Sequence, residues 1–274
     1  MTDRYALFGN PLGHSKSPLI HNGFAKSLGH DVEYSLIEAP LDGFADAARA
    51  WRDSGAKGCN ITTPFKLDAF ALATHRLQRA ELAGAANCLK FEPDGRILAE
   101  MFDGIGLAND IERNLGVPMK GKRVLMLGAG GTVRGALAPF LACGPATLVV
   151  ANRTVEKAAA LARQFAAHGP VSGCGYGDLG GERFDLVLNA TSASLRGELP
   201  AVPPTAFVGA ALAYELAYGK GLTPFLRLAQ NAGVARLADG VGMLVEQAAE
   251  AWVWWRGVRP PTRAVIDQLT VPLR

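Results

Sequence analysis

Residues 122–133 read KRVLMLGAGGTV, and this stretch decides the fold. Its first half is a short apolar run typical of a buried strand, and its second half is a glycine turn that opens a helix over residues 133–141. Such a turn lets backbone N–H groups approach a pyrophosphate, and the helix N-terminus favours the anion electrostatically. In this context the stretch predicts a Rossmann-type dinucleotide-binding domain. For the glycines alone, an ordinary strand-to-helix turn remains the alternative.

The end of the next predicted strand indicates which dinucleotide is bound. NAD enzymes usually carry an acidic residue there, which accepts from the ribose 2′-hydroxyl. This chain instead has Asn152-Arg153-Thr154, with Lys157 one turn into the following helix. An arginine can clamp a 2′-phosphate and a lysine adds a point charge, so we predict NADP; solvated charges at a helix start are the alternative. The predicted cofactor-binding residues of this region are Gly128, Ala129, Gly130, Gly131, Thr132, Asn152, Arg153, Thr154 and Lys157, with Thr154 also expected to cap the helix.

Composition excludes several other classes of protein. Of 274 residues, 49% are hydrophobic and 19% charged, and the formal net charge is only +3, with no basic stripe interleaved with aromatics for nucleic acid. No apolar run reaches membrane-spanning length, and the N-terminus lacks a signal-peptide pattern. The four cysteines have no zinc-binding spacing, so no metal is expected. We therefore expect a cytoplasmic enzyme with small-molecule ligands and neither a nucleic-acid nor a membrane partner.

Two alternating series of strands and helices predict two α/β domains. We expect residues 1–102 with 239–274 to form a discontinuous substrate-binding catalytic domain, residues 103–238 the Rossmann-type domain, and the active site to lie in the cleft between them. The predicted strands cover residues 5–9, 33–37, 58–61, 87–92, 96–99, 123–127, 147–151, 185–189 and 207–211. The predicted helices cover residues 18–28, 43–53, 104–115, 133–141, 155–167, 224–231 and 242–255, with a last one from residue 262.

Polar residues in the first half occur at spacings that packing does not explain. Ser15 and Ser17 point the same way in extended backbone and suit one small anion such as a carboxylate. Ser17 also has a structural explanation, as the N-cap of the following helix. Asn60 and Thr62 repeat the arrangement at the end of an apolar strand.

Lys66 is predicted to lie in the first turn of a short helix. There the helix dipole disfavours its ammonium group, and a lowered pKa would suit a catalytic base. Asp103 would raise that pKa again if it lay beside the lysine.

Several segments together resemble the shikimate dehydrogenase family, over nearly the whole chain from about Tyr5 to Trp255. The matching segments are 9–18 (GNPLGHSKSP), 60–66 (NITTPFK), 85–87 (AAN), 103–104 (DG) and 238–247 (ADGVGMLVEQ).

The resemblance implies reversible hydride transfer between NADPH and 3-dehydroshikimate in aromatic amino acid biosynthesis, by a monomer or homodimer. It implies that Lys66 and Asp103 are the catalytic pair. It implies further roles for residues grouped by ligand: Ser15, Ser17, Thr62 and Tyr218 at the substrate carboxylate; Asn60, Asn87, Asp103 and Gln247 at its hydroxyls; Leu216, Gly240 and Met243 on the nicotinamide side of the cofactor. A quinate/shikimate dehydrogenase preferring NAD and a catalytically silent ligand-binding paralogue are the alternatives. The joint presence of Lys66, Asp103, Asn87 and Gln247 argues against the silent paralogue.

Two departures from the family pattern bear on specificity. Met101-Phe102 stand where the family usually has Asn-Thr, directly before Asp103. In an extended segment Met101 would face the same side as Asp103 and raise its pKa by desolvation. The departure is either compensated packing or a change of substrate. Glu215 stands where the family usually has Asp, which keeps the charge but changes its reach.

Overall fold

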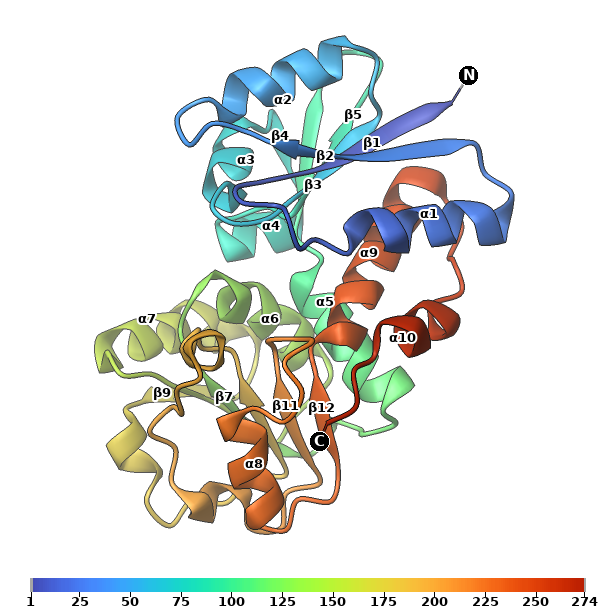
Figure 1. The fold of residues 1–274 in the computed structure, drawn as a ribbon. Helices are drawn as coiled ribbons and strands as arrows, with labels where there is room; N and C mark the ends of the chain where they lie inside the picture. Colours follow the sequence, from blue (N-terminus) through green and yellow to red (C-terminus); the bar gives the residue numbers. More distant parts are fainter. Residues whose placement is uncertain (1, 274) are drawn as a thin grey trace. The chain divides into compact units, whose positions relative to one another are not determined.

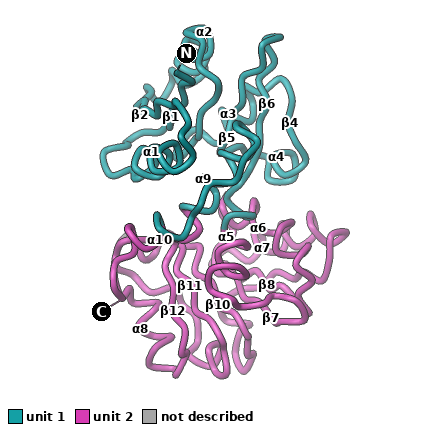
Figure 2. The backbone as a smooth tube through the Cα atoms, turned by 90° about the vertical axis from the view of Figure 1, so that its right-hand side faces the viewer, with its two compact units in different colours: residues 1–106, 245–265 teal, residues 107–244, 266–274 magenta. Residues whose placement is uncertain are grey.

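The computed structural model describes residues 2–273 and divides into two compact units, drawn in different colours in Figure 2. The first unit comprises Met1–Gly106 and Val245–Val265, and the second Leu107–Leu244 and Ile266–Arg274. The first unit is therefore discontinuous in sequence. Our expected boundaries differ from these in three respects: residues 103–106 belong to the first unit, residues 239–244 belong to the second, and the chain from Ile266 onward also belongs to the second, where Leu273 packs against the core.

The first unit is built on a six-stranded mixed sheet with the order β2-β1-β3-β5-β6-β4. β1 pairs in parallel with β2 and β3, whereas β5 runs antiparallel to both β3 and β6. The strands are β1 (Asp3–Gly9), β2 (Val32–Glu38), β3 (Gly58–Ile61), β4 (His75–Arg76), β5 (Cys88–Phe91) and β6 (Ile97–Glu100). The helices are α1 (Ser17–Leu28), α2 (Phe44–Asp53), α3 (Lys66–Leu72), α4 (Gln78–Ala83), the first part of α5 (Asp103–Asn109) and most of α9 (Val241–Arg256).

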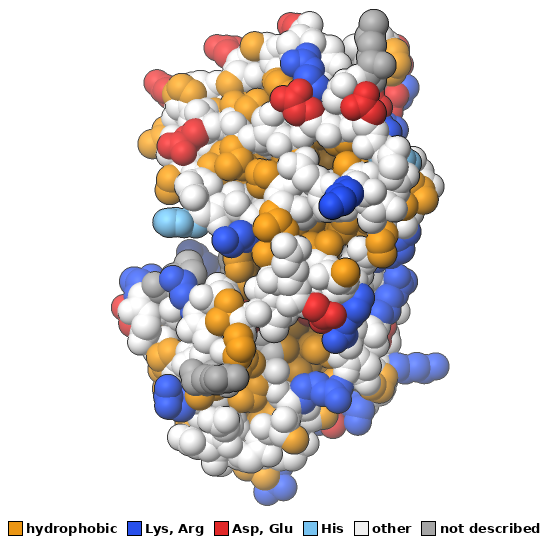
Figure 3. All heavy atoms as spheres, turned by 45° about the vertical axis from the view of Figure 1, so that its right-hand side comes forward, with side chains coloured by type: hydrophobic (Ala, Val, Ile, Leu, Met, Phe, Trp, Pro, Cys, Tyr) orange, Lys and Arg blue, Asp and Glu red, His pale blue; other side chains and the backbone are white. Residues whose placement is uncertain are grey.

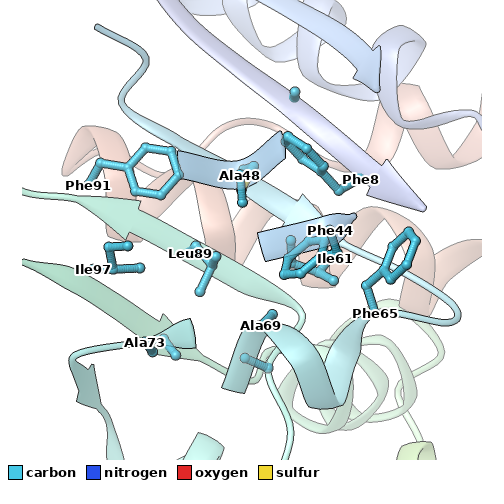
Figure 4. Close-up of a cluster of buried hydrophobic side chains, with 14 of the residues drawn as sticks. Phe8, Phe44, Ala48, Ile61, Phe65, Ala69, Ala73, Leu89, Phe91 and Ile97 are labelled. Carbon is cyan, nitrogen blue, oxygen red and sulfur yellow. The ribbon is translucent and has the colours of Figure 1, made fainter. Parts of the chain in front are cut away.

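Successive side chains of β1 and β3 point alternately to the two faces of this sheet and contribute to the core on each face. Phe8 and Ile61 pack on one face with Phe44 and Phe65 of the α2 and α3 region, in the cluster drawn in Figure 4. The opposite face carries Tyr5, Leu7 and Tyr34, covered by aromatic side chains of α1 and α9. Both faces are buried, which explains why β1 has a continuous apolar run over residues 5–8.

The second unit is built on a six-stranded parallel sheet with the order β12-β11-β10-β7-β8-β9. The strands are β7 (Arg123–Leu127), β8 (Thr147–Ala151), β9 (Val171–Cys174), β10 (Leu186–Asn189), β11 (Leu212–Glu215) and β12 (Leu237–Asp239), and the helices α6 (Gly131–Ala142), α7 (Val155–Phe165), α8 (Pro224–Asn231) and α10 (Arg263–Leu269). Read in chain order, this is the strand order of a Rossmann domain, with its switch point between β7 and β10. Helices α6 and α7 follow β7 and β8 in the chain, and the ribbon in Figure 1 shows the two helices next to each other.

One strand prediction was wrong. Residues 207–211 were expected to be a strand, but Phe207 ends a 3₁₀ turn (Pro204–Phe207), and the strand is β11. The reason lies in Gly209, whose φ of 81° is incompatible with a strand, while Phe207 is buried in the core. The structure also adds β4, α4, β9 and β12, which we did not predict.

The surface agrees with the modest net charge. On the face drawn in Figure 3, basic and acidic side chains occur among hydrophobic ones. Within residues 2–273, no helix is both long and apolar enough to cross a membrane.

Candidate active site

The centre of the first unit's site is an ion pair between Lys66 and Asp103. Lys66 is the first residue of α3 and Asp103 the first residue of α5, and Lys66 Nζ lies 2.5 Å from Asp103 Oδ2. The aspartate side chain is 9% exposed and the lysine side chain 25% exposed. Part of the lysine side chain is therefore accessible to a ligand, while the buried carboxylate of Asp103 balances its charge.

Asn87 and Gln247 complete this centre. Asn87 Nδ2 donates to Asp103 Oδ1 at 2.6 Å and to Gln247 Oε1 at 3.2 Å. Its own Oδ1 accepts from the backbone N–H of Phe102 at 2.8 Å. Each oxygen of Asp103 thus has a donor, and the carboxylate is held from two sides. We name Lys66, Asn87, Asp103 and Gln247 the lysine–aspartate cluster.

The residues that depart from the family pattern lie inside the unit. Met101 is fully buried against Ala83 and Ala85. Phe102 is 2% exposed, and its ring meets that of Trp254 edge-on at 5.7 Å. Because Phe102 contacts Asn87 through its backbone N–H, that hydrogen bond does not depend on the side chain at position 102. Both side chains thus make packing contacts inside the first unit, as the first of our two interpretations expects.

The serine pair lies at the start of α1. Our prediction that Ser17 is the N-cap was wrong: Lys16 occupies the N-cap, and Ser17 is the first helical residue. The hydroxyl of Ser15 accepts from the backbone N–H of Ser17 at 3.2 Å and so satisfies the first N–H group of the helix. Ser15 is partly exposed and Ser17 buried.

Asn60 lies in β3 and Thr62 directly follows that strand, and the two side chains are buried to very different degrees. Thr62 is partly exposed, and its backbone N–H donates to Phe8 at 2.9 Å. Asn60 is 4% exposed, and its Oδ1 accepts from the hydroxyl of Tyr34 at 2.7 Å. The ring of Tyr34 stacks on His21 at 4.1 Å. The amide nitrogen of Asn60 is one of the buried polar atoms without a hydrogen-bond partner within residues 2–273.

The glycine turn of the second unit has the shape of a phosphate cradle. Gly128 follows β7 with φ 109°, a backbone conformation that favours glycine. Gly130 and Gly131 are exposed at the N-terminus of α6, and a Cβ at either would meet nothing within 4 Å. Ala129 and Thr132 are partly exposed beside them. The open space and the outward N–H groups of α6 fit a dinucleotide pyrophosphate.

The end of β8 presents cations beside this cradle. Arg153 and Lys157 are exposed, and neither forms a salt bridge with a described carboxylate. Asn152 Nδ2 donates to the backbone oxygen of Thr154 at 2.9 Å, which shapes the turn. Thr154 is the N-cap of α7, but our prediction that its hydroxyl caps the helix was wrong, because no side-chain cap bond forms there. Its hydroxyl is left for other contacts.

The remaining predicted residues of the second unit lie at the ends of β11 and β12. Gly240 is buried against Leu216: a Cβ at Gly240 would lie 2.1 Å from the Leu216 carbonyl oxygen. The backbone N–H of Met243 donates to the hydroxyl of Tyr214 at 3.3 Å. Tyr218 is 38% exposed, and burial of part of its ring raises the pKa of its hydroxyl.

A second polar cluster, which we did not predict, lies in this unit around Glu215, a residue that we had noted only as a departure from the family pattern. Asn189 ends β10, Glu215 ends β11, and both are fully buried and hydrogen-bonded to each other. The available signal was a polar residue directly after an apolar strand, the same pattern that singled out Asn60. The described residues contain no group of three or more His, Cys, Asp or Glu placed to hold a metal ion.

Comparison with known proteins yields matches over both units. Residues 7–89 match the model of the shikimate dehydrogenase substrate-binding domain, 109–196 that of shikimate/quinate 5-dehydrogenase, and 240–270 that of the shikimate 5'-dehydrogenase C-terminal domain. The chain is 55% identical over 269 residues to a shikimate dehydrogenase (NADP(+)) of Nitrosospira multiformis, covering 98% of each.

Two solved structures are similar along the whole chain. One is the Ael1 enzyme from Pseudomonas putida, 61% identical with a TM-score of 0.96, covering 100% of both chains. The other is the shikimate 5-dehydrogenase from Thermus thermophilus in complex with NADP(H) and shikimate, 29% identical with a TM-score of 0.87, covering 97% of this chain and 98% of that one.

Proposed function

Because this chain belongs to the shikimate dehydrogenase family, we propose that it reversibly reduces 3-dehydroshikimate to shikimate with NADPH. The observation that carries the proposal is the lysine–aspartate cluster, in which a partly exposed ammonium group is paired with a buried, doubly hydrogen-bonded carboxylate. Three relatives that are 51% to 55% identical to this chain are named shikimate dehydrogenase (NADP(+)).

The roles of the cluster follow from the charge that the reaction creates. NADPH supplies the hydride when bound. As the ketone oxygen gains negative charge, Lys66 Nζ stabilises it and donates a proton to it. Asp103 keeps the ammonium aimed and accepts from an adjacent substrate hydroxyl, while Asn87 and Gln247 bind further hydroxyls. In the reverse direction Lys66 accepts the proton of the shikimate hydroxyl.

Residues outside the lysine–aspartate cluster would bind the carboxylate of the substrate and the cofactor. Ser15, Ser17, Thr62 and Tyr218 offer hydroxyls to the substrate carboxylate. The buried Asn60 would act through its amide nitrogen alone. Residues 128–132 would hold the pyrophosphate, Asn152, Arg153, Thr154 and Lys157 the 2′-phosphate end, and Leu216, Gly240 and Met243 would pack beside the nicotinamide.

The NAD-dependent quinate/shikimate alternative is less well supported. Arg153 and Lys157 are exposed cations at the strand end where an NAD enzyme carries a carboxylate. The silent-paralogue alternative is disfavoured by the intact lysine–aspartate cluster. We also propose that the protein acts in the cytoplasm, as a monomer or homodimer, on small molecules alone.

Steady-state kinetics with shikimate and quinate, each with NADP and NAD, test the proposal. We expect turnover of shikimate with NADP, and a fall in kcat of about a hundredfold or more in Lys66→Ala. Lys57→Ala, at an exposed lysine of the same unit, is the matched control and should leave kcat unchanged. Wild-type protein that turns over none of the four pairs would refute the function, and a Lys66→Ala variant of near-wild-type kcat would remove Lys66 from its role.

The same assay tests the packing assignment of Met101 and Phe102. If both side chains only pack, the double variant Met101→Asn/Phe102→Thr should lose stability and gain no activity. A large gain in kcat/KM for shikimate would instead show that these residues restrict the substrate.

A further inference from the structure

Glu215 is a buried carboxylate without a cation. It is fully buried at the end of β11, and no salt bridge between described residues involves it. Four donors surround it instead: Asn189 Nδ2 at 3.0 Å, Thr223 Oγ1 at 3.2 Å, the backbone N–H of Ala217 at 3.3 Å, and the hydroxyl of Ser194. Burial raises the pKa of Glu215, and these hydrogen bonds oppose the rise. A set composed entirely of donors is the environment that an ionised carboxylate requires.

This carboxylate determines how Asn189 is oriented. A carboxylate only accepts hydrogen bonds, so the NH₂ group of Asn189 must face Glu215 and its carbonyl must face the other way. The carbonyl oxygen, Oδ1, then accepts from the backbone N–H of Thr191 at 3.1 Å and from its hydroxyl at 2.7 Å. The hydroxyl of Thr191 in turn accepts from the backbone N–H of Ala193 at 3.3 Å. Glu215 therefore fixes the turn at residues 189–194 at both ends, through the amide group of Asn189 and through the hydroxyl of Ser194.

The turn at residues 189–194 packs directly on the glycine turn. The backbone N–H of Ala190 donates to Leu127, the last residue of β7, at 2.9 Å. A Cβ on Gly128 would lie 3.1 Å from the carbonyl oxygen of Ala190 and 3.4 Å from the side chain of Thr191. The glycine turn thus rests against a wall whose shape depends on Asn189 and Glu215.

We propose that Glu215 is a positioning residue for dinucleotide binding, which holds the turn at residues 189–194 against the glycine turn at residues 128–131. The inference rests on the proposed NADP-dependent function, and it deepens that function by assigning a residue that touches neither substrate nor cofactor. The same carboxylate reaches Thr223, whose hydroxyl caps α8 by accepting from the backbone N–H of Leu226. The hydrogen bonds of Glu215 therefore link the end of β11, where it lies, to the end of β10 and to the start of α8.

The neutral isostere is the informative substitution. Glu215→Gln keeps the shape but replaces one oxygen by an NH₂ group, which would face a donor on either side of the site. We expect the Kd for NADPH, measured by fluorescence titration without substrate, to rise about tenfold. The Kd for NADH should rise by a similar factor, because the two dinucleotides share the pyrophosphate that the glycine turn binds. Arg153→Ala, in contrast, should weaken NADPH binding alone.

Three further variants complete the test. Glu182→Gln removes an exposed carboxylate of the same unit, where it pairs with Arg123, and should leave both Kd values unchanged. Ser194→Ala keeps the charge but removes one donor, and should raise both Kd values by a smaller factor. Glu215→Asp restores the charge with a shorter reach and should recover part of the affinity.

Unchanged Kd values in both Glu215→Gln and Ser194→Ala would overturn the inference, even if both variants had lower melting temperatures. If Glu215→Gln does not fold, the result for Ser194→Ala decides. Failure of the proposed function looks different: wild-type protein would bind NADPH and yet not oxidise shikimate.

Discussion

His21 should make the first unit sensitive to mild acid. The residue lies on α1, is 1% exposed, and neither ring nitrogen has a hydrogen-bond partner within residues 2–273. Its ring is stacked between aromatic side chains, with Tyr34 at 4.1 Å. Burial lowers the pKa of His21 from 6.5 to about 3, and the nearby Asn60 opposes this only in small part.

The sign and size of the effect follow from that pKa. Because the folded pKa lies below the unfolded one, the unfolded chain binds more protons between pH 6.5 and pH 3, and the free energy of unfolding falls as the pH falls. Between pH 7 and pH 5 the loss attributable to His21 is ~1.9 kcal/mol. This figure barely depends on the folded pKa, provided that it lies well below 5. Above about pH 7 the histidine contributes almost no pH dependence.

The measurement uses the tryptophans of the chain. All four (Trp51, Trp252, Trp254 and Trp255) belong to the first unit, so urea unfolding followed by tryptophan fluorescence reports on that unit. His21→Phe keeps an aromatic ring in the stack and removes the titration, without breaking a hydrogen bond. The difference in unfolding free energy between pH 7 and pH 5 should be ~1.9 kcal/mol smaller in His21→Phe than in the wild type. His75→Gln, at an exposed histidine, should behave like the wild type. Equal pH dependence in the wild type and His21→Phe would refute the reasoning.

Three other predictions concern packing and cofactor choice. Gly240→Ala should destabilise the second unit by ~1–3 kcal/mol, because its Cβ would collide with the carbonyl oxygen of Leu216; an unchanged melting temperature would contradict the tight approach. Phe102→Ala should lower the free energy of unfolding of the first unit by ~3–5 kcal/mol in urea titrations, and a loss below 1 kcal/mol would mean that the ring is not a packing residue. Arg153→Ala should raise the Kd for NADPH about tenfold and leave that for NADH unchanged, with Lys157→Ala having a smaller effect of the same kind; equal losses for both dinucleotides would exclude a 2′-phosphate contact.

The predictions from sequence were best where a short segment contains both the backbone geometry of a site and the residues that act there. The glycine turn after β7 has one apolar strand before it and one helix after it, so the Rossmann-type unit followed from about twelve residues. The family was inferred from five short segments, and the family matches over both units confirm it. The NADP prediction rested on Arg153 and Lys157, and the relatives' names agree with it.

Tertiary arrangement accounts for most of what the sequence did not predict. β12 is only three residues long, and β9 contains Ser172 and Gly173, so neither has the pattern of an isolated strand. Asn87 and Gln247 are 160 residues apart, and only the resemblance brought them together. Likewise Met101 was expected to face the same side as Asp103, but the extended backbone ends where α5 begins at Asp103, and Met101 packs into the core.

The discontinuity of the first unit has a consequence for biosynthesis. All six strands of the second sheet have been made once the ribosome passes Asp239, whereas the first unit still awaits Val245–Val265. Until that segment emerges, Trp252 and Trp255 cannot cover His21 and the face of the first sheet that carries Tyr5. The nascent chain therefore exposes an aromatic surface throughout the synthesis of its second half, and a chaperone that binds such surfaces would find it there.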